Sequence, residues 1–219
     1  MKKYRLFNIL ETTIIMALIL SFSIAVPVFF RPFYYLHINM LGLPDQTGLS
    51  YQQIKTAYDE MMDFCCGLTD RFATGDLHYS QEGMEHFIDV KKLFILDLVI
   101  LIVSIIAFVI LCIIKKKVLK VEKTTLLHTN GYYASTVLAA LFIAIALFSL
   151  CNFDRTFVIF HKVFFPGKSN WIFDPYRDEI INILPEVFFR NCAIVIVTLI
   201  IICFIICIYR DYKQRKNNH

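Results

Sequence analysis

Two histidines stand at matching positions beside apolar stretches that are long enough to cross a membrane. His86 lies seven residues before the stretch that begins at Leu93, and His161 lies eight residues after the stretch that ends at Phe153. We therefore expect both side chains at the same membrane interface. Because an imidazole titrates near neutral pH, two of them at one depth can act as a general base and a general acid. The alternative is that both hydrogen-bond lipid headgroups and take no part in catalysis.

Two carboxylates fall inside apolar stretches. Asp97 lies in the stretch that follows His86, where a carboxylate is costly unless it is paired or faces a cavity. If a helix beginning at Gln81 continues into this stretch, His86 and Asp97 share one face, which makes Asp97 a functional candidate. The alternative is an ion pair with a neighbouring base: Lys91, Lys92 or Arg190. We expect Glu11, in the first apolar stretch, to pair with a base within Lys115–Lys117.

Several familiar catalytic patterns are missing from the sequence. There is no Gly-x-Ser-x-Gly, no phosphate-binding P-loop and no His-Glu-x-x-His. Nucleophilic serine, nucleotide and zinc chemistry therefore have no support. The seven cysteines contain no Cys-x-x-Cys pair, which argues against a disulfide oxidase linked to quinone. We expect neither a metal nor a cofactor.

The composition is that of a membrane protein. Hydrophobic residues make up 58% of the 219 positions, against about 45–50% in ordinary globular domains. Mean hydropathy is +0.61 and only 18% of residues are charged, which excludes intrinsic disorder. Four stretches reach the roughly 20 apolar residues that a spanning helix needs; they are residues 6–30, 93–114, 132–153 and 192–209. We predict an all-α membrane protein, with residues 1–219 forming a single membrane domain with four spans.

Basic residues gather beside the spans on one side. The N-terminus, the loop 115–131 and the tail after Tyr209 carry net charges of +3, +4 and +3, whereas loops 31–92 and 154–191 carry −4 and 0. Since Lys and Arg accumulate on the cytoplasmic side, both termini and loop 115–131 are predicted to be cytoplasmic. Loops 31–92 and 154–191 are then extracytoplasmic, in a multi-pass plasma-membrane protein. The net charge of +4 indicates orientation and contact with membrane lipid, and no nucleic acid partner is expected.

Three of the four remaining histidines are weaker candidates. His37 lies close behind the first span, and His128 and His219 fall on the predicted cytoplasmic side, where we expect them to be solvated. None of these three has the matched placement of the histidines described above. We therefore leave them out of the predicted site.

The two large loops have helix signals of their own. Ser50 and Gln53 form a capping-box pattern before an amphipathic segment that should end near Gly67, and Ser80 can cap a helix that runs unbroken from Gln81 into the second span. The third span stays compatible with a helix as far as Phe165. Asp174-Pro175 then predicts a new α-helix that ends before Pro185. The second loop is rich in aromatic residues, so we expect it to lie on the outer leaflet.

The two histidines stand within longer motifs. The first is Tyr79-Ser80-…-His86-Phe87-Ile88-Asp89-Val90-Lys91, and the second is Phe160-His161-Lys162-Val163-Phe164-Phe165-…-Trp171, followed by Leu184-Pro185-Glu186-Val187-Phe188-Phe189. With four spans, these motifs resemble the bacterial lipoprotein intramolecular transacylase family over essentially the whole chain. By that resemblance, His86 and His161 match the family's two essential histidines. Supporting roles are implied for Asp89, Trp171 and Arg190.

The resemblance also implies a reaction, in the envelope of Gram-positive bacteria and without a cofactor. The substrate would be a diacylglyceryl-modified lipoprotein in the outer leaflet, with the active site on the extracytoplasmic side. The enzyme would move the sn-2 acyl chain to the α-amine of the N-terminal cysteine, giving a lyso-form lipoprotein. An α-ammonium of pKa about 7.7–8.0 must first lose a proton, for which a histidine is a suitable base. The other histidine could stabilise the oxyanion or protonate the leaving hydroxyl.

A different class of function remains open at this point. The chain could be a non-enzymatic four-span protein, such as an adhesion or accessory subunit, in which the histidines are dispensable. A transporter is less attractive because only Glu11 and Asp97 bring charge into the spans and no broken helix is evident.

Overall fold

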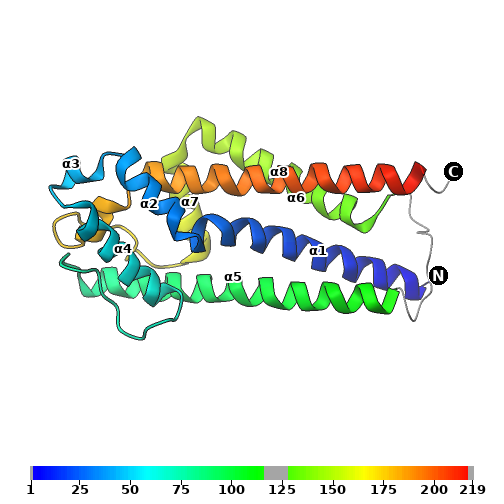
Figure 1. The fold of residues 1–219 in the computed structure, drawn as a ribbon, viewed down its shortest axis with the longest axis horizontal. Helices are drawn as coiled ribbons and strands as arrows, with labels where there is room; N and C mark the ends of the chain where they lie inside the picture. Colours follow the sequence, from blue (N-terminus) through cyan, green and yellow to red (C-terminus); the bar gives the residue numbers. More distant parts are fainter. Residues whose placement is uncertain (1, 116–127, 217–219) are drawn as a thin grey trace. The chain divides into compact units, whose positions relative to one another are not determined.

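The fold is helical throughout the part of the chain that the structure describes. The computed structural model describes residues 2–115 and 128–216, and within them no β-strand occurs. Four helices are long and apolar enough to cross a membrane (Figure 1): α1 (Lys2–Phe29), α5 (Gln81–Ile114), α6 (Asn130–Cys151) and α8 (Glu186–Lys216). The predicted all-α class with four transmembrane helices is confirmed.

The chain divides into two compact units. The span unit consists of Met1–Val26, Leu98–Phe148 and Ile194–His219, and the loop unit consists of Pro27–Asp97 and Ser149–Ala193. Helices α5 and α8 each contribute one part to each unit. Both predicted histidines fall in the loop unit.

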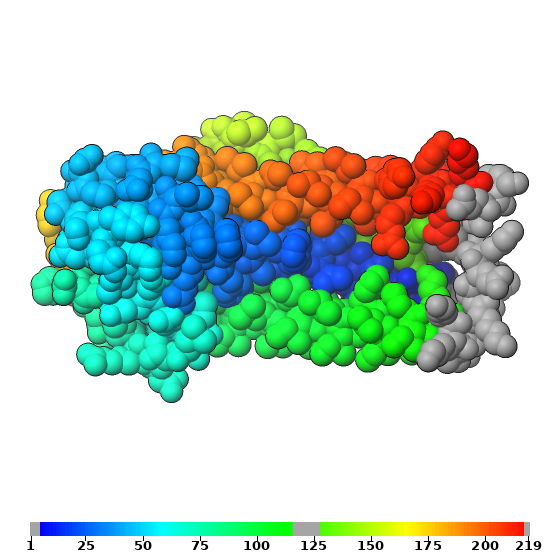
Figure 2. Space-filling view, viewed as in Figure 1, coloured from blue at the N-terminus to red at the C-terminus, as the bar shows by residue number. Residues whose placement is uncertain are grey.

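The span unit has a small core and a large apolar exterior. Ile19 of α1, Leu138 of α6 and Ile200 of α8 are buried against one another. On α5, by contrast, Ile102 and Val103 are more than half exposed, and the space-filling view shows this green segment at the surface (Figure 2). Exposed aliphatic side chains on helices of this length suit contact with lipid tails.

Polar clusters join the helix ends of the span unit. Lys115 Nζ donates to both carboxylate oxygens of Glu11 at 3.0 Å, and Asn130 Nδ2 donates to the same carboxylate at 2.7 Å. The predicted pairing of Glu11 is thus confirmed for Lys115, while Lys116 and Lys117 lie outside the described residues. The expectation that His128 is solvated is wrong, because its Nδ1 bonds the buried carboxylate of Asp211 at 2.9 Å. His219 lies outside the described residues.

The loop unit is built around short helices that the sequence only partly indicated. They are α2 (Arg31–Met40), α3 (Leu43–Thr47), α4 (Tyr51–Cys65) and the 3-10 helix η2 (Glu179–Ile183). Tyr34 of α2 stacks on Tyr58 of α4 with ring centroids 3.6 Å apart, and its hydroxyl donates to the carbonyl of Ile183 at 2.7 Å. The aromatic pair and this hydrogen bond join α2, α4 and η2 in one core.

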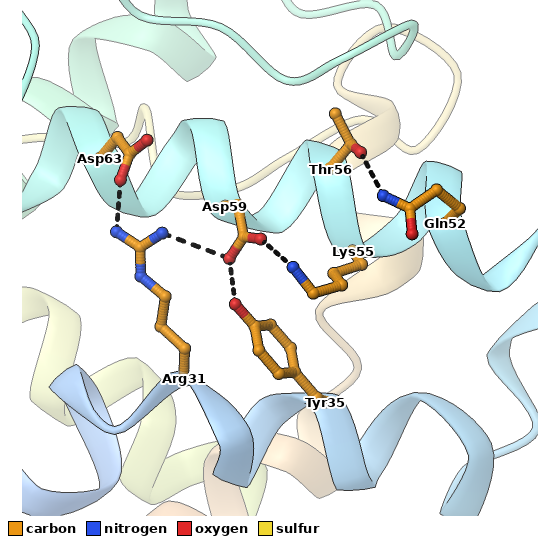
Figure 3. A network of polar contacts seen from close by, with 7 residues as sticks. All are labelled: Arg31, Tyr35, Gln52, Lys55, Thr56, Asp59 and Asp63. Atoms are coloured by element: carbon orange, nitrogen blue, oxygen red, sulfur yellow. Dashed lines mark hydrogen bonds and ion pairs between the residues drawn. The ribbon is translucent and has the colours of Figure 1, made fainter.

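A polar network on α2 and α4 reinforces this core (Figure 3). The Asp59 carboxylate accepts hydrogen bonds from Arg31 at 3.3 Å, from Tyr35 at 2.5 Å and from Lys55 at 2.6 Å, and Arg31 also bonds Asp63. Arg31 and Tyr35 belong to α2, whereas the other three residues belong to α4. The network therefore ties the two helices together beside their shared apolar surface.

Two predicted helix starts are confirmed. Ser50 and Gln53 form the complete capping box at the start of α4, and Gly67, with φ +75°, follows its end. Ser80 Oγ accepts the Gly83 N–H at 2.9 Å at the start of α5. Helix α5 then runs 34 residues without interruption, as predicted.

The third apolar stretch does not continue as one helix. Helix α6 ends at Cys151, and a separate helix α7 (Phe153–Phe164) begins after Asn152. Asn152 has extended backbone, and its side chain accepts the Arg155 N–H at 2.8 Å. The prediction of an unbroken helix as far as Phe165 is wrong because this asparagine acts as a helix cap.

The predicted α-helix after Asp174-Pro175 is also absent. Asp174 Oδ1 accepts the N–H of Tyr176 at 3.0 Å in a local turn, and only the five-residue 3-10 helix η2 follows. Its first residue donates its N–H to His78 at 3.0 Å. Ile180 and Ile183 are buried, and a spacing of three residues suits a 3-10 helix. Tertiary hydrogen bonding and burial therefore override the local helix signal.

Candidate active site

His86 stands on the second turn of α5, and that helix start is held from two sides. Ser80 Oγ caps the helix, and the Ser80 N–H donates to Asp178 Oδ1 at 2.8 Å. A Cβ at Gly83 would meet the same Asp178 oxygen at 2.1 Å, so only glycine allows this close approach. The His86 side chain, three residues later, is buried.

His161 stands near the end of α7 with one ring nitrogen already engaged. Its Nδ1 lies 2.8 Å from the carbonyl oxygen of Phe157. A carbonyl only accepts, so Nδ1 must carry the proton, and Nε2 of the neutral ring holds the lone pair. This backbone contact therefore fixes the tautomer that leaves Nε2 available as a base.

The fold brings these two histidines together from helices that are far apart in the sequence. Their ring centroids lie 5.8 Å apart with planes at 34°, and both residues are buried. Within residues 2–115 and 128–216, His86 Nδ1 has no hydrogen-bond partner. A buried polar atom without a partner costs free energy, which a group on a bound substrate could recover.

Aromatic rings enclose the pair. Phe165 and Phe173 meet the His86 ring edge-on at centroid distances of 4.9 and 5.4 Å. Trp171 stacks on His161 at 4.7 Å with planes at 27°. Burial among these rings lowers the pKa of His161 below its usual value, although the Phe157 carbonyl opposes this shift. His161 is therefore neutral, as a general base must be, at neutral pH.

Asp89 and Trp171, both predicted as supporting residues, lie close to the pair, and a lysine that sequence reasoning missed connects them. Asp89 is buried one turn after His86 and forms ion pairs with Lys92, at 3.0 Å, and with Lys168. The indole N–H of Trp171 donates to the Lys168 backbone carbonyl at 3.0 Å. The only local signal for Lys168 is its place in the turn after Pro166-Gly167.

The structure also describes Asp97 and Arg190, the two other residues predicted to support the site. Asp97 is half-buried on α5 eight residues after Asp89, about 12 Å further along the helix axis. Arg190 is exposed on α8. Two lysines were considered as ion-pair partners of Asp97. Lys92 forms an ion pair with Asp89. Lys91 lies 3.8 Å from the Asp70 carboxylate and donates a hydrogen bond to the Thr69 carbonyl.

A third buried histidine in the loop unit differs from the pair. His37 Nδ1 donates to the carbonyl of Phe33 at 2.7 Å, and its Nε2 accepts from Asn191 Nδ2 at 3.0 Å. With both ring nitrogens engaged by the protein, His37 has no nitrogen to offer a substrate. Its contacts join α2 to α8, which is a structural role.

No metal centre is visible in the described ranges. Across residues 2–115 and 128–216, no three His, Cys, Asp or Glu side chains lie close enough together to hold a metal ion.

Comparisons with known proteins agree on one family. The family model described as lipoprotein intramolecular transacylase Lit matches residues 9–189. The solved structure of the membrane integral lipoprotein intramolecular transacylase Lit from Bacillus cereus matches with a TM-score of 0.85 and 28% identity, over 98% of this chain and 96% of that chain.

Two further structures of the Bacillus cereus protein also match. One histidine is replaced by arginine in the first and by alanine in the second, and each matches with a TM-score of 0.79 and 28% identity. Both matches cover 98% of this chain, and they cover 92% and 94% of those chains. A search of curated proteins gave no match.

Proposed function

Since the chain belongs to the lipoprotein intramolecular transacylase family, we propose that His86 and His161 transfer the protons of an acyl migration within a lipoprotein. The chain is a multi-pass membrane protein and an acyltransferase; a purely accessory or adhesive role does not fit this family. We propose as its substrate a lipoprotein whose N-terminal cysteine carries an S-diacylglyceryl group and a free α-amine.

The proposed reaction exchanges one bond for another within the substrate. The α-amine nitrogen attacks the carbonyl carbon of the sn-2 ester and forms a tetrahedral intermediate. The bond from that carbon to the glyceryl oxygen then breaks, an amide remains, and the proton lost by the nitrogen ends on the glyceryl hydroxyl. Atoms and electrons balance without water or a cofactor.

We assign the role of base to His161. Its Nδ1–H is held by the Phe157 carbonyl, which leaves the Nε2 lone pair to take the proton from the attacking amine. Its pKa is lowered by burial, so the ring is neutral when the substrate arrives. This arrangement supports general-base catalysis near neutral pH.

We assign to His86 the role of hydrogen-bond donor to oxygen. It would first stabilise the oxyanion of the tetrahedral intermediate and then interact with the oxygen of the leaving glyceryl group. Its ring lies 5.8 Å from that of His161 between centroids, and its Nδ1 has no partner among the described residues. A donor held in a desolvated site stabilises a developing negative charge more strongly than one in water.

The aromatic enclosure supports transfer over hydrolysis. Water would compete with the amine for the ester, and rings such as Phe165, Trp171 and Phe173 leave little polar surface to hold it. Because amine and ester belong to one molecule, much of the entropic barrier is already removed. The remaining task of the protein is to fold the substrate so that the two groups meet between the histidines.

The contact between the His86 and His161 rings is the observation that carries this proposal. The test is to express the wild type, His86→Gln and His161→Gln in cells that lack such an enzyme, and to analyse lipoprotein N-terminal peptides by mass spectrometry. We expect N-acyl, S-monoacylglyceryl peptides from the wild type and from the control His78→Gln, which changes an exposed histidine. Wild-type product levels from a stably expressed His86→Gln or His161→Gln protein would contradict the proposal.

A further inference from the structure

We propose that Lys168 is a positioning residue that fixes the orientation of His161 relative to His86. This inference rests on the proposed function, because it gives these two histidines a joint role. Lys168 lies in the turn between α7 and η2 and reaches both helices that carry them. Three successive contacts make the connection.

The first contact joins the turn to α5. The Asp89 carboxylate stands one turn after His86, its side chain is only 9% exposed, and it pairs with the Lys168 ammonium. Removing Lys168 would leave this buried carboxylate with the exposed Lys92 as its remaining ion-pair partner, which is unfavourable. Lys168 is therefore held where α5 places Asp89.

The second contact lies within the turn itself. The Lys168 N–H donates to the carbonyl of Phe165 at 3.2 Å, and the Lys168 carbonyl accepts the indole N–H of Trp171 at 3.0 Å. Gly167, with φ +74°, provides the left-handed conformation that the turn requires. The Lys168 backbone thus links Phe165, which touches both histidine rings, to Trp171.

The third contact returns to α7. The Trp171 indole stacks on His161 at a centroid distance of 4.7 Å with planes at 27°. An unbroken series of contacts therefore runs from the helix of His86 through Asp89, Lys168 and Trp171 to the ring of His161. A catalytic ring held by packed neighbours keeps the geometry that proton transfer needs.

Lys92 provides a matched control. It also bonds Asp89, at 3.0 Å, but it belongs to α5 and its side chain is 69% exposed. Its removal takes one cation from Asp89 without touching the turn that carries Trp171. A purely electrostatic role would make the two lysines equivalent, whereas the proposed positioning role distinguishes them.

The only tryptophan in the chain is Trp171, so indole fluorescence of the full-length purified protein, excited beyond the absorption of its 11 tyrosines, reports on the surroundings of this one residue. A stacked imidazolium quenches indole emission more strongly than a neutral imidazole, and emission as a function of pH therefore follows His161. Because burial lowers the pKa of His161, we expect the wild-type midpoint below about 6.5, the ordinary histidine value. Other titratable groups linked to this ring pair are His86, which faces the His161 ring, and Asp89 with its partners Lys92 and Lys168.

We expect Lys168→Met to free Trp171 from the ring. Emission should shift to the red, acrylamide should quench it more strongly, and the titration midpoint should rise or disappear. Lys168→Arg should restore the wild-type signal, and Lys92→Met should leave it unchanged. Should Lys168→Met not be recovered folded, Lys168→Gln makes the same test. The proposal would be overturned if folded Lys168→Met or Lys168→Gln kept the wild-type emission spectrum and titration midpoint. It would also be overturned if Lys92→Met showed the same red shift and change of midpoint as Lys168→Met.

Activity is the second measurement. A catalytic group displaced by about 1 Å can lose as much as 100-fold in rate, so we expect Lys168→Met to lower kcat with little change in KM. Asp89→Asn should do the same, and the double variant should be no worse than either single one. Altered fluorescence with undiminished kcat would overturn the positioning role. Full activity of His161→Gln would instead refute the proposed function and leave the fluorescence result standing.

Discussion

At the scale of single residues, what distinguishes the proposed catalytic histidines is which ring nitrogen the protein leaves available. Both nitrogens of His37 bond protein groups, whereas His161 engages Nδ1 alone, with the Phe157 carbonyl. The Nδ1 of His86 has no partner among the described residues. Three buried histidines of one unit thus divide into a structural one and a pair that can serve a substrate.

If His86 and His161 transfer the same proton, the losses of turnover caused by replacing each of them should not multiply in the double variant. General acid–base help is typically worth about 10²–10⁴-fold, so His86→Gln and His161→Gln should each lower the turnover number by that order. The double variant should be hardly slower than either single variant, because each change alone already interrupts the transfer. Turnover of a synthetic diacylglyceryl peptide by purified protein measures this. Multiplying losses in the double variant would mean that the two histidines act independently.

At the scale of helices, the site depends on contacts at the start of α5. Ser80 and Asp178 hold the first turn of that helix, and Gly83 allows the approach of Asp178. His86 follows directly and Asp89 one turn later. The same helix that contributes a span therefore presents both the proposed catalytic group and the anchor for Lys168.

The α2–α4 network predicts how the loop unit responds to acid. Burial alone would raise the pKa of Asp59, but hydrogen bonds from Lys55 and Tyr35 outweigh this and hold it below its usual value. A carboxylate with a lowered folded-state pKa stabilises the fold above its unfolded pKa, and this contribution is lost as pH falls through the folded-state pKa. We expect Asp59→Asn to destabilise the protein by about 1–3 kcal/mol at neutral pH.

The measurement is thermal unfolding of the purified protein at several pH values. The difference between wild type and Asp59→Asn should narrow below about pH 3.9, the unfolded-state pKa of aspartate. Asp76→Asn, which changes an exposed carboxylate of the same unit, should unfold like the wild type. A stability difference for Asp59→Asn that does not vary with pH would show that the charge of Asp59 is not what stabilises the helix pair.

At the scale of the whole molecule, the orientation in the membrane stays a prediction of the charge distribution. Basic residues cluster at both ends of the chain and in the loop after α5, which places these segments in the cytoplasm. The loop unit and its histidine pair would then face the outside, where the proposed lipoprotein substrate would be anchored.

Labelling of single cysteines tests this orientation. In a background whose seven native cysteines are replaced, Lys162→Cys and Lys213→Cys each introduce a thiol at an exposed position. An impermeant maleimide should label the first in intact cells and the second only after lysis. Labelling of Lys213→Cys in intact cells, with Lys162→Cys protected, would reverse the topology.

The sequence by itself determined the features that arise from short-range physics. Helices α1, α5, α6 and α8 follow from apolar length, because a bilayer requires about 20 apolar residues per span. The starts of α4 and α5 follow from Ser50 and Ser80, since a cap acts within three residues. The histidine candidates followed from residue type and distance to the spans, together with a resemblance in the motifs around them.

Only the tertiary structure decided which residues meet. The break at Asn152 and the 3-10 form of η2 reflect hydrogen bonds that outweigh local helix propensity. The contact of His86 with His161 and the ion pair of Lys168 with Asp89 depend on packing between segments about 75 to 80 positions apart in the chain. Such contacts leave no periodic or local signal, because what selects them is the shape of the folded loop unit and the burial of Asp89 within it.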